Sequence, residues 1–81
     1  MSIRVLLFAS LADIAGLREI ALEPGGLADI ESVFERLAAD FPALGPYRSV
    51  VLCARNREFA DRKAPVLDGD EIALFPPVSG G

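Results

Sequence analysis

The sequence predicts an α+β fold in which one main helix packs across a mixed β-sheet. Apolar residues alternate with other residues near both ends of the chain, as they do in strands. A central stretch has the 3.6-residue spacing of an amphipathic helix, and glycine and proline clusters separate these segments. With 81 residues, of which 52% are hydrophobic, the chain can bury one core as a single domain.

The first predicted elements are a strand, a short helical turn and a second strand. Over residues 3–8 the odd positions share one apolar face, and the even positions, which end at Phe8, share the other. A helical turn over residues 10–15 is expected to stop at Gly16. Alternation resumes over residues 18–22, and a Pro-Gly-Gly run then ends the second strand.

The main helix is expected to begin after Asp29, which is a plausible N-cap. Its apolar stripe extends to Phe41, and its charged residues lie on the opposite, solvated side. The prolines and glycine between positions 42 and 46 predict that the helix ends there and a loop follows.

Three further strands are predicted in the second half. The run of residues 50–54 is apolar throughout, which indicates a central strand buried on both faces. A tight reversal at Asn56 leads to a short strand over 58–60, and an Asp-Gly turn precedes the last strand, 71–75. The first and last strands both run long and apolar, so we expect them side by side in the centre. This is the layout of the β-grasp, or ubiquitin-like, fold, although periodicity alone also allows other small α+β sheets.

The chain closes on Gly80-Gly81, and this end is the strongest candidate for chemistry. We expect a β-grasp domain over residues 1–75 and a flexible, extended tail over 76–81, because Pro76-Pro77 ends ladder pairing. The tail lacks bulky side chains at its tip and can thread into a narrow site of another protein. The threading residues would be Pro76, Pro77, Val78, Ser79 and Gly80. The Gly81 carboxylate can be adenylated and then attacked by a nucleophile; the alternative is a frayed terminus.

Several classes of function are disfavoured. The net charge is −4 and the basic residues are scattered, which argues against a nucleic-acid partner. One cysteine and no histidine give no metal site, and Cys53 is expected to be a buried, inert thiol. The N-terminus has no leader-like segment and the sequence has no membrane-spanning run, so we expect a soluble, cytoplasmic protein without a membrane partner. For the carboxylates of Asp68, Asp70 and Glu71, turn formation and contact with a basic partner are favoured over cation binding.

An exposed aromatic cluster is also expected. Consecutive residues of a strand point to opposite faces of the sheet, so Phe8 and Phe75 point away from the face of Leu7 and Leu74. Their rings would therefore meet at the surface, with Phe59 near them. Exposed aromatic patches often mark interfaces. We therefore predict that these three residues bind a partner; the alternative is a satellite hydrophobic cluster beneath a loop.

Finally, the closing run LDGDEIALFPPVSGG (67–81), together with Phe8-Ala9 and Asn56, resembles the small subunit of molybdopterin synthase, a sulfur carrier. The chain has Ala12-Asp13 where that family often has Arg-Glu. The resemblance covers the whole chain and implies the β-grasp fold.

The resemblance also implies a mechanism and partners. An adenylyltransferase similar to ubiquitin-activating enzymes would use ATP and magnesium to adenylate Gly81, while the chain itself binds no cofactor. A sulfur donor, either a sulfurtransferase or a cysteine desulfurase, would then give a C-terminal thiocarboxylate. The tail would enter the large subunit of a heterotetrameric synthase and donate sulfur to cyclic pyranopterin monophosphate, so the chain is not catalytic alone.

Two other functions share the Gly-Gly end. One is a related sulfur carrier for thiamin or cysteine synthesis or for tRNA thiolation. The other is a ubiquitin-like modifier that is conjugated to lysines. Pro76-Pro77 and the length of 81 residues favour the molybdopterin interpretation over the shorter thiamin carriers.

Overall fold

The computed structural model describes residues 2–77 and contains one five-stranded sheet with helices on one side. The elements are β1 (Ile3–Leu7), α1 (Ser10–Ala15), β2 (Glu19–Leu22), α2 (Ile30–Asp40), the 3₁₀ helix η1 (Pro42–Tyr47), β3 (Leu52–Arg55), β4 (Glu58–Ala60) and β5 (Glu71–Phe75). The predicted division between a domain and a tail cannot be followed beyond Pro77, because residues 78–81 lie outside the described part of the chain.

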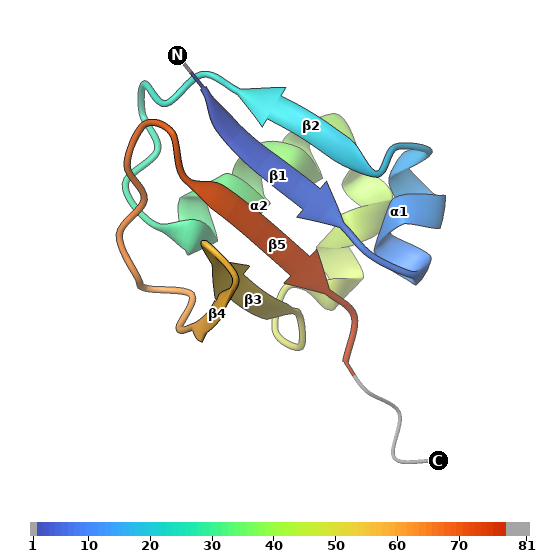
Figure 1. Ribbon diagram of the computed structural model, residues 1–81. Coiled ribbons are helices and arrows are strands. Elements are labelled where there is room, and N and C mark those ends of the chain that lie inside the picture. Colours follow the sequence, from blue (N-terminus) through green and yellow to red (C-terminus); the bar gives the residue numbers. More distant parts are fainter. Residues whose placement is uncertain (1, 78–81) are drawn as a thin grey trace.

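The sheet has the strand order β2-β1-β5-β3-β4, so the first and last strands lie side by side at its centre (Figure 1). β1 and β5 pair in parallel, with Val5 opposite Ile72 and Leu7 opposite Leu74. The other neighbouring strands pair antiparallel. This topology confirms the predicted β-grasp fold.

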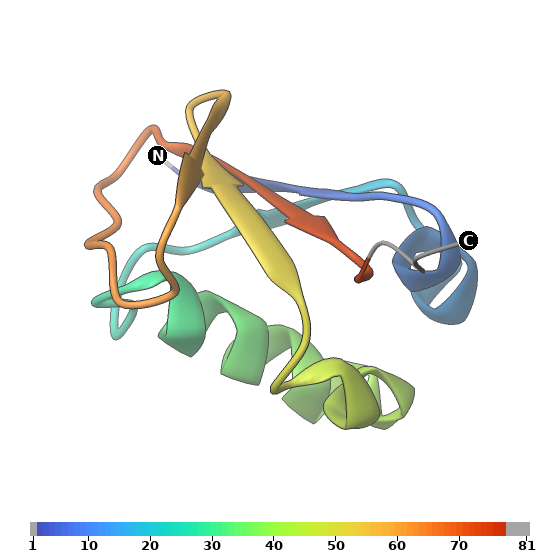
Figure 2. The same ribbon diagram turned by 90° about the horizontal axis from the view of Figure 1, so that it is seen from below.

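Helix α2 covers one face of the sheet, as Figure 2 shows. It begins at a capping box: the Asp29 carboxylate accepts a hydrogen bond from the Ser32 N–H (2.8 Å), and the Ser32 hydroxyl accepts one from the Asp29 N–H (3.1 Å). The prediction of Asp29 as N-cap is therefore confirmed. The helix packs its apolar stripe on the inward side chains of β1 and β5. Fully buried residues of this core are Ile3, Val5, Leu11, Ile30, Val33, Leu37, Leu44, Ile72 and Leu74.

Two predictions about local structure need correction. The segment expected to be a loop after the main helix forms η1, because Pro42 at its first position suits a helical start and Leu44 is buried against the core. The apolar run 50–54 is not buried throughout. β3 begins only at Leu52, and Val50 and Leu52 are 44% and 41% exposed, because no layer formed by residues 2–77 covers the second face of the sheet.

The turns around β5 depend on one buried carboxylate, that of Asp70. It accepts hydrogen bonds from Arg55 Nε (3.0 Å), Asn56 Nδ2 (3.0 Å) and the Leu67 N–H (2.8 Å). Burial raises the pKa of Asp70, but these three hydrogen bonds outweigh burial and hold its pKa below the usual range. Asp70 therefore serves the fold, joining the β3–β4 turn to the start of β5. The reversal at Asn56 is confirmed, with left-handed backbone there (φ 50°).

Candidate functional site: the open face of the sheet

The candidate site lies on the sheet face that α2 leaves uncovered, which is turned toward the viewer in Figure 1. Strand alternation sends the even-numbered residues of β1 and β3 and the odd-numbered residues of β5 to this face. Its apolar part, here called the aromatic patch, consists of Leu6, Phe8, Leu52, Phe59, Ala73 and Phe75. The register brings them together across β1, β5, β3 and β4.

The three phenylalanines meet, as the sequence predicted. The rings of Phe8 and Phe75 are stacked, with centroids 4.7 Å apart and planes 15° from parallel. The Phe59 ring is tilted against Phe75 at 6.1 Å. Phe8 is 41% exposed and Phe59 is 82% exposed, whereas Phe75 is half-buried between them. That geometry is confirmed, and the partner-binding role of the three residues stays a prediction.

Charged side chains border the aromatic patch on the side away from the end of β5. Glu71 forms ion pairs with Arg4 and, at 3.7 Å, with Arg57, and Arg4 Nε also lies 4.0 Å from Glu19. The hydrogen bond from Arg4 to Glu71, together with the charges of Glu71 and Glu19, raises the pKa of Arg4, so this guanidinium remains charged. This border and all residues of the patch except Leu52 line a shallow hollow of about 560 Å³. An apolar centre with a charged rim is the usual anatomy of a protein interface.

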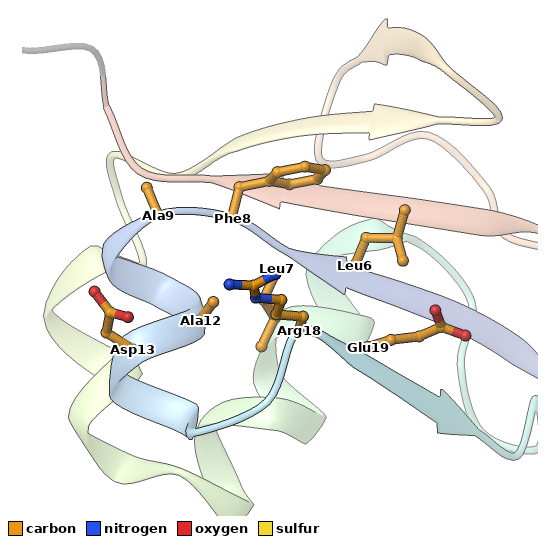
Figure 3. A pocket seen from close by; sticks show the side chains of 8 residues that line it. All are labelled: Leu6, Leu7, Phe8, Ala9, Ala12, Asp13, Arg18 and Glu19. Atoms are coloured by element: carbon orange, nitrogen blue, oxygen red, sulfur yellow. The ribbon is translucent and has the colours of Figure 1, made fainter.

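A second hollow of about 480 Å³, the corner hollow, adjoins the first between β1, α1 and the start of β2 (Figure 3). It is lined by Leu6, Phe8, Ala12, Asp13, Arg18 and Glu19, among others. This hollow could not be predicted from the sequence, because it depends on the packing of α1 beside β1.

The tail begins at the edge of the aromatic patch. The Phe8 N–H donates a hydrogen bond to the Leu74 carbonyl (3.2 Å), which holds the end of β5 against β1. Pro76, half-buried, and Pro77, exposed, follow directly on Phe75. Val78, Ser79, Gly80 and Gly81, the remaining predicted tail residues, lie outside the described residues. The predicted site thus combines a described aromatic patch with a terminus that the sequence alone identifies.

Cys53 lies away from this face and is buried, as predicted. Burial raises the pKa of its thiol; the charge of Arg62 lowers this pKa by a smaller amount, and the charge of Asp61 raises it further. A thiol with a raised pKa is mostly protonated at neutral pH and is a poor nucleophile. Within residues 2–77, no group of three or more His, Cys, Asp or Glu side chains is arranged to hold a metal ion, and no helix is long and apolar enough to cross a membrane.

Leu52 is a patch residue that sequence reasoning placed wrongly. It pairs with Phe75 across β3 and β5 and is 41% exposed. Because Leu52 directly precedes Cys53, strand alternation places the two side chains on opposite faces of the sheet. The apolar run around Leu52 nevertheless favoured a strand buried on both faces.

Comparisons with known proteins agree with the fold and the sequence pattern. The profile of the ThiS family matches residues 5–81. A molybdopterin synthase sulfur carrier subunit from Chlamydomonas reinhardtii is 37% identical over 83 residues, which span 100% of both chains. Small archaeal modifier protein 1 from Haloferax volcanii is 37% identical over 93% of this chain and 95% of its own.

Solved structures extend the likeness to three dimensions. The crystal structure of SAMP1 from Haloferax volcanii superposes with a TM-score of 0.81 at 35% identity and covers 100% of both chains. A chain in a complex of subunits 1 and 2 of molybdopterin-converting factor from Helicobacter pylori shares the fold, with a TM-score of 0.68 at 24% identity over 100% of both chains. By the match to its profile over nearly the whole sequence, this chain belongs to the ThiS family.

Proposed function

We propose that this chain is the sulfur-carrier subunit of a molybdopterin synthase and that its Gly81 carboxylate carries the sulfur. The observation that supports this most strongly is the likeness to a subunit of that name over the full length of both chains. The Gly80-Gly81 end supplies the carboxylate. The aromatic patch supplies an apolar surface where the tail begins.

The proposed chemistry takes place on Gly81. An adenylyltransferase joins the Gly81 carboxylate to the AMP part of ATP and releases pyrophosphate; the ATP and magnesium are bound by that enzyme. Sulfide, supplied by the sulfur donor, then displaces AMP from the acyl carbon and leaves a thiocarboxylate. The thiocarboxylate sulfur bonds to a carbon of cyclic pyranopterin monophosphate as a carbon–oxygen bond at that carbon breaks. Water then cleaves the resulting thioester, which leaves the sulfur on the pterin and restores the Gly81 carboxylate.

The fold positions the start of the tail for this chemistry. Phe75 is the last residue of β5, so a partner that contacts its ring holds the chain directly before Pro76. The residues 76–81, if extended, reach roughly 20 Å at about 3.3–3.6 Å per residue. A partner seated on the aromatic patch can therefore keep its active site well away from the sheet. Because the same tail must visit both the activating enzyme and the large subunit, we infer that both proteins contact this face.

A second candidate is a ubiquitin-like modifier, and one observation favours it. Small archaeal modifier protein 1 matches this chain about as well as the sulfur carriers do. Both functions begin with adenylation of a terminal glycine and differ only in the nucleophile that follows.

The product of activation distinguishes the two functions. The purified chain is incubated with an adenylyltransferase of this class, ATP, magnesium and sulfide, and the intact mass is measured. A sulfur carrier gains the mass that corresponds to replacing one oxygen by sulfur, and this gain depends on ATP. A product joined to lysines of other proteins, without a thiocarboxylate, would contradict the proposal and support the modifier.

A further inference from the structure

The corner hollow is continuous with the aromatic patch, and the proposed function does not yet use it. Leu6, Phe8 and Glu19 line both hollows, so a protein that covers the patch also reaches the mouth of the corner hollow. Figure 3 shows Leu6 and Phe8 on the β1 side, Ala12 and Asp13 on α1 opposite them, and the Arg18 side chain between the two. The corner hollow and the aromatic patch therefore form one continuous surface.

Two features of the chain keep the corner hollow open. Ala9 has a left-handed φ of 52°, which turns the backbone sharply from β1 into α1 and separates the two elements. Ala12 then presents only a methyl group to the space. A longer side chain at position 12 would occupy it.

The lining determines what kind of group fits. Most of the lining is apolar, including Leu6, Phe8 and Ala12, and the charged lining residues are Asp13, Arg18 and Glu19. Among these, Asp13 and Arg18 form no ion pair with any residue between positions 2 and 77. Both remain available to polar groups that flank an inserted side chain. This combination of apolar walls and available polar groups suits one apolar side chain from a protein partner.

We infer that the corner hollow receives an apolar side chain of the synthase large subunit, the same protein that is proposed to cover the aromatic patch. This inference rests on the proposed function. It assigns to α1 a role in partner selection: Ala12 admits a projecting side chain, and a larger residue at that position excludes it.

Filling the hollow tests this inference. The dissociation constant for the purified large subunit is measured by titration calorimetry for the wild type, Ala12→Leu and Ala12→Met, and the melting temperature is recorded for each. Both substitutions keep good helix formers in α1. The matched control is Ala39→Leu, which makes the same change at an exposed position of α2, away from the sheet. We expect the two filling variants to bind at least about tenfold more weakly, which corresponds to the loss of one buried apolar contact, while Ala39→Leu binds as the wild type does.

The outcomes separate this inference from the proposed function. Filling variants that keep the wild-type melting temperature and the wild-type affinity would overturn the inference, even if Phe75→Ala weakens binding. If Ala12→Leu lowers the melting temperature, the affinity of Ala12→Met for the large subunit tests the inference instead, because the unbranched methionine side chain adapts to irregular space. Absence of any binding between the wild-type chain and the large subunit would instead contradict the proposed function.

Discussion

The two faces of the central strands have the same alternating pattern but different environments. The side chains of Val5, Ile72 and Leu74 point toward α2 and are fully buried. Their neighbours Phe8 and Phe75 point the other way and remain exposed or half-buried, although they are equally apolar. The comparison teaches that apolar character alone does not define the core. The face that α2 covers provides stability, and the face that α2 leaves uncovered is available for binding.

Keeping an apolar face exposed has a free-energy cost that only a partner removes. Burial of apolar surface contributes about 25 cal/mol for each Å² removed from water. The stacked Phe8 and Phe75 rings hide part of each other, which lowers that cost in the free chain. Phe59, at 82% exposure, has little such protection. A partner that covers these rings would bury the apolar surface that is still exposed, and the free energy of that burial would favour binding.

The largest effect on stability is expected on the covered face. Leu74→Ala should lower the free energy of unfolding by about 2–5 kcal/mol, because it leaves a cavity between β5 and α2. Urea unfolding followed by circular dichroism measures the change. A loss below about 1 kcal/mol would show that this face does not carry the core as described.

The adjacent residue on the open face is expected to behave differently. Phe75→Ala should weaken binding to the large subunit by about 2 kcal/mol, roughly thirtyfold, because a central aromatic anchor is removed. Its effect on unfolding should be smaller than that of Leu74→Ala. The control is Glu35→Ala on the solvated side of α2. Equal affinities for the Phe75→Ala variant and the control in a titration would remove the case for the aromatic patch.

The turns that hold β5 in place should show a pH dependence. The pKa of Asp70 is lowered in the folded state, so the carboxylate contributes stability at pH values above its ordinary pKa of 3.8, and this contribution is lost as the pH falls through the native pKa. Asp70→Asn should cost about 1.5 kcal/mol at pH 7, since its amide cannot accept from Arg55 and Asn56 together.

The same comparison at acid pH tests the cause. Urea unfolding of the wild type and Asp70→Asn should give free energies that begin to converge as the pH falls below 3.8, the ordinary pKa of the carboxyl. The convergence is complete only below the lower native pKa, where the carboxyl is protonated in the folded chain as well. A difference that stays constant from pH 7 to pH 3 would contradict the electrostatic explanation.

Most of the fold could be predicted from the sequence, for physical reasons that differ between regions. Alternation in residues 3–7 and 71–75 and the N-cap at Asp29 are local signals, and all three were confirmed. The exposure of Leu52 was not predicted, because it depends on whether another layer covers the open face of the sheet. The stacked Phe8 and Phe75 followed from parity, whereas the corner hollow arises from tertiary packing of α1 and left no local signal.

The smallest effect is expected at Cys53, which is buried on the covered face and takes no part in the proposed chemistry. Cys53→Ala should lower the free energy of unfolding by about 1 kcal/mol through a small loss of core volume. Sulfur transfer in a reconstituted synthase assay should be unchanged. Loss of transfer with an unchanged melting temperature would instead assign chemistry to this thiol.

The most direct test of the account concerns Gly81, which we propose carries the sulfur. Two variants, one lacking Gly81 and one extended by a single residue beyond it, are compared with the wild type for thiocarboxylate formation and molybdopterin production. We predict that both variants lose sulfur transfer and keep the wild-type melting temperature, because the covered face stabilises the fold without the tip of the tail. An extended chain that still supports molybdopterin production, with its added residue shown by mass spectrometry to be intact, would contradict the account.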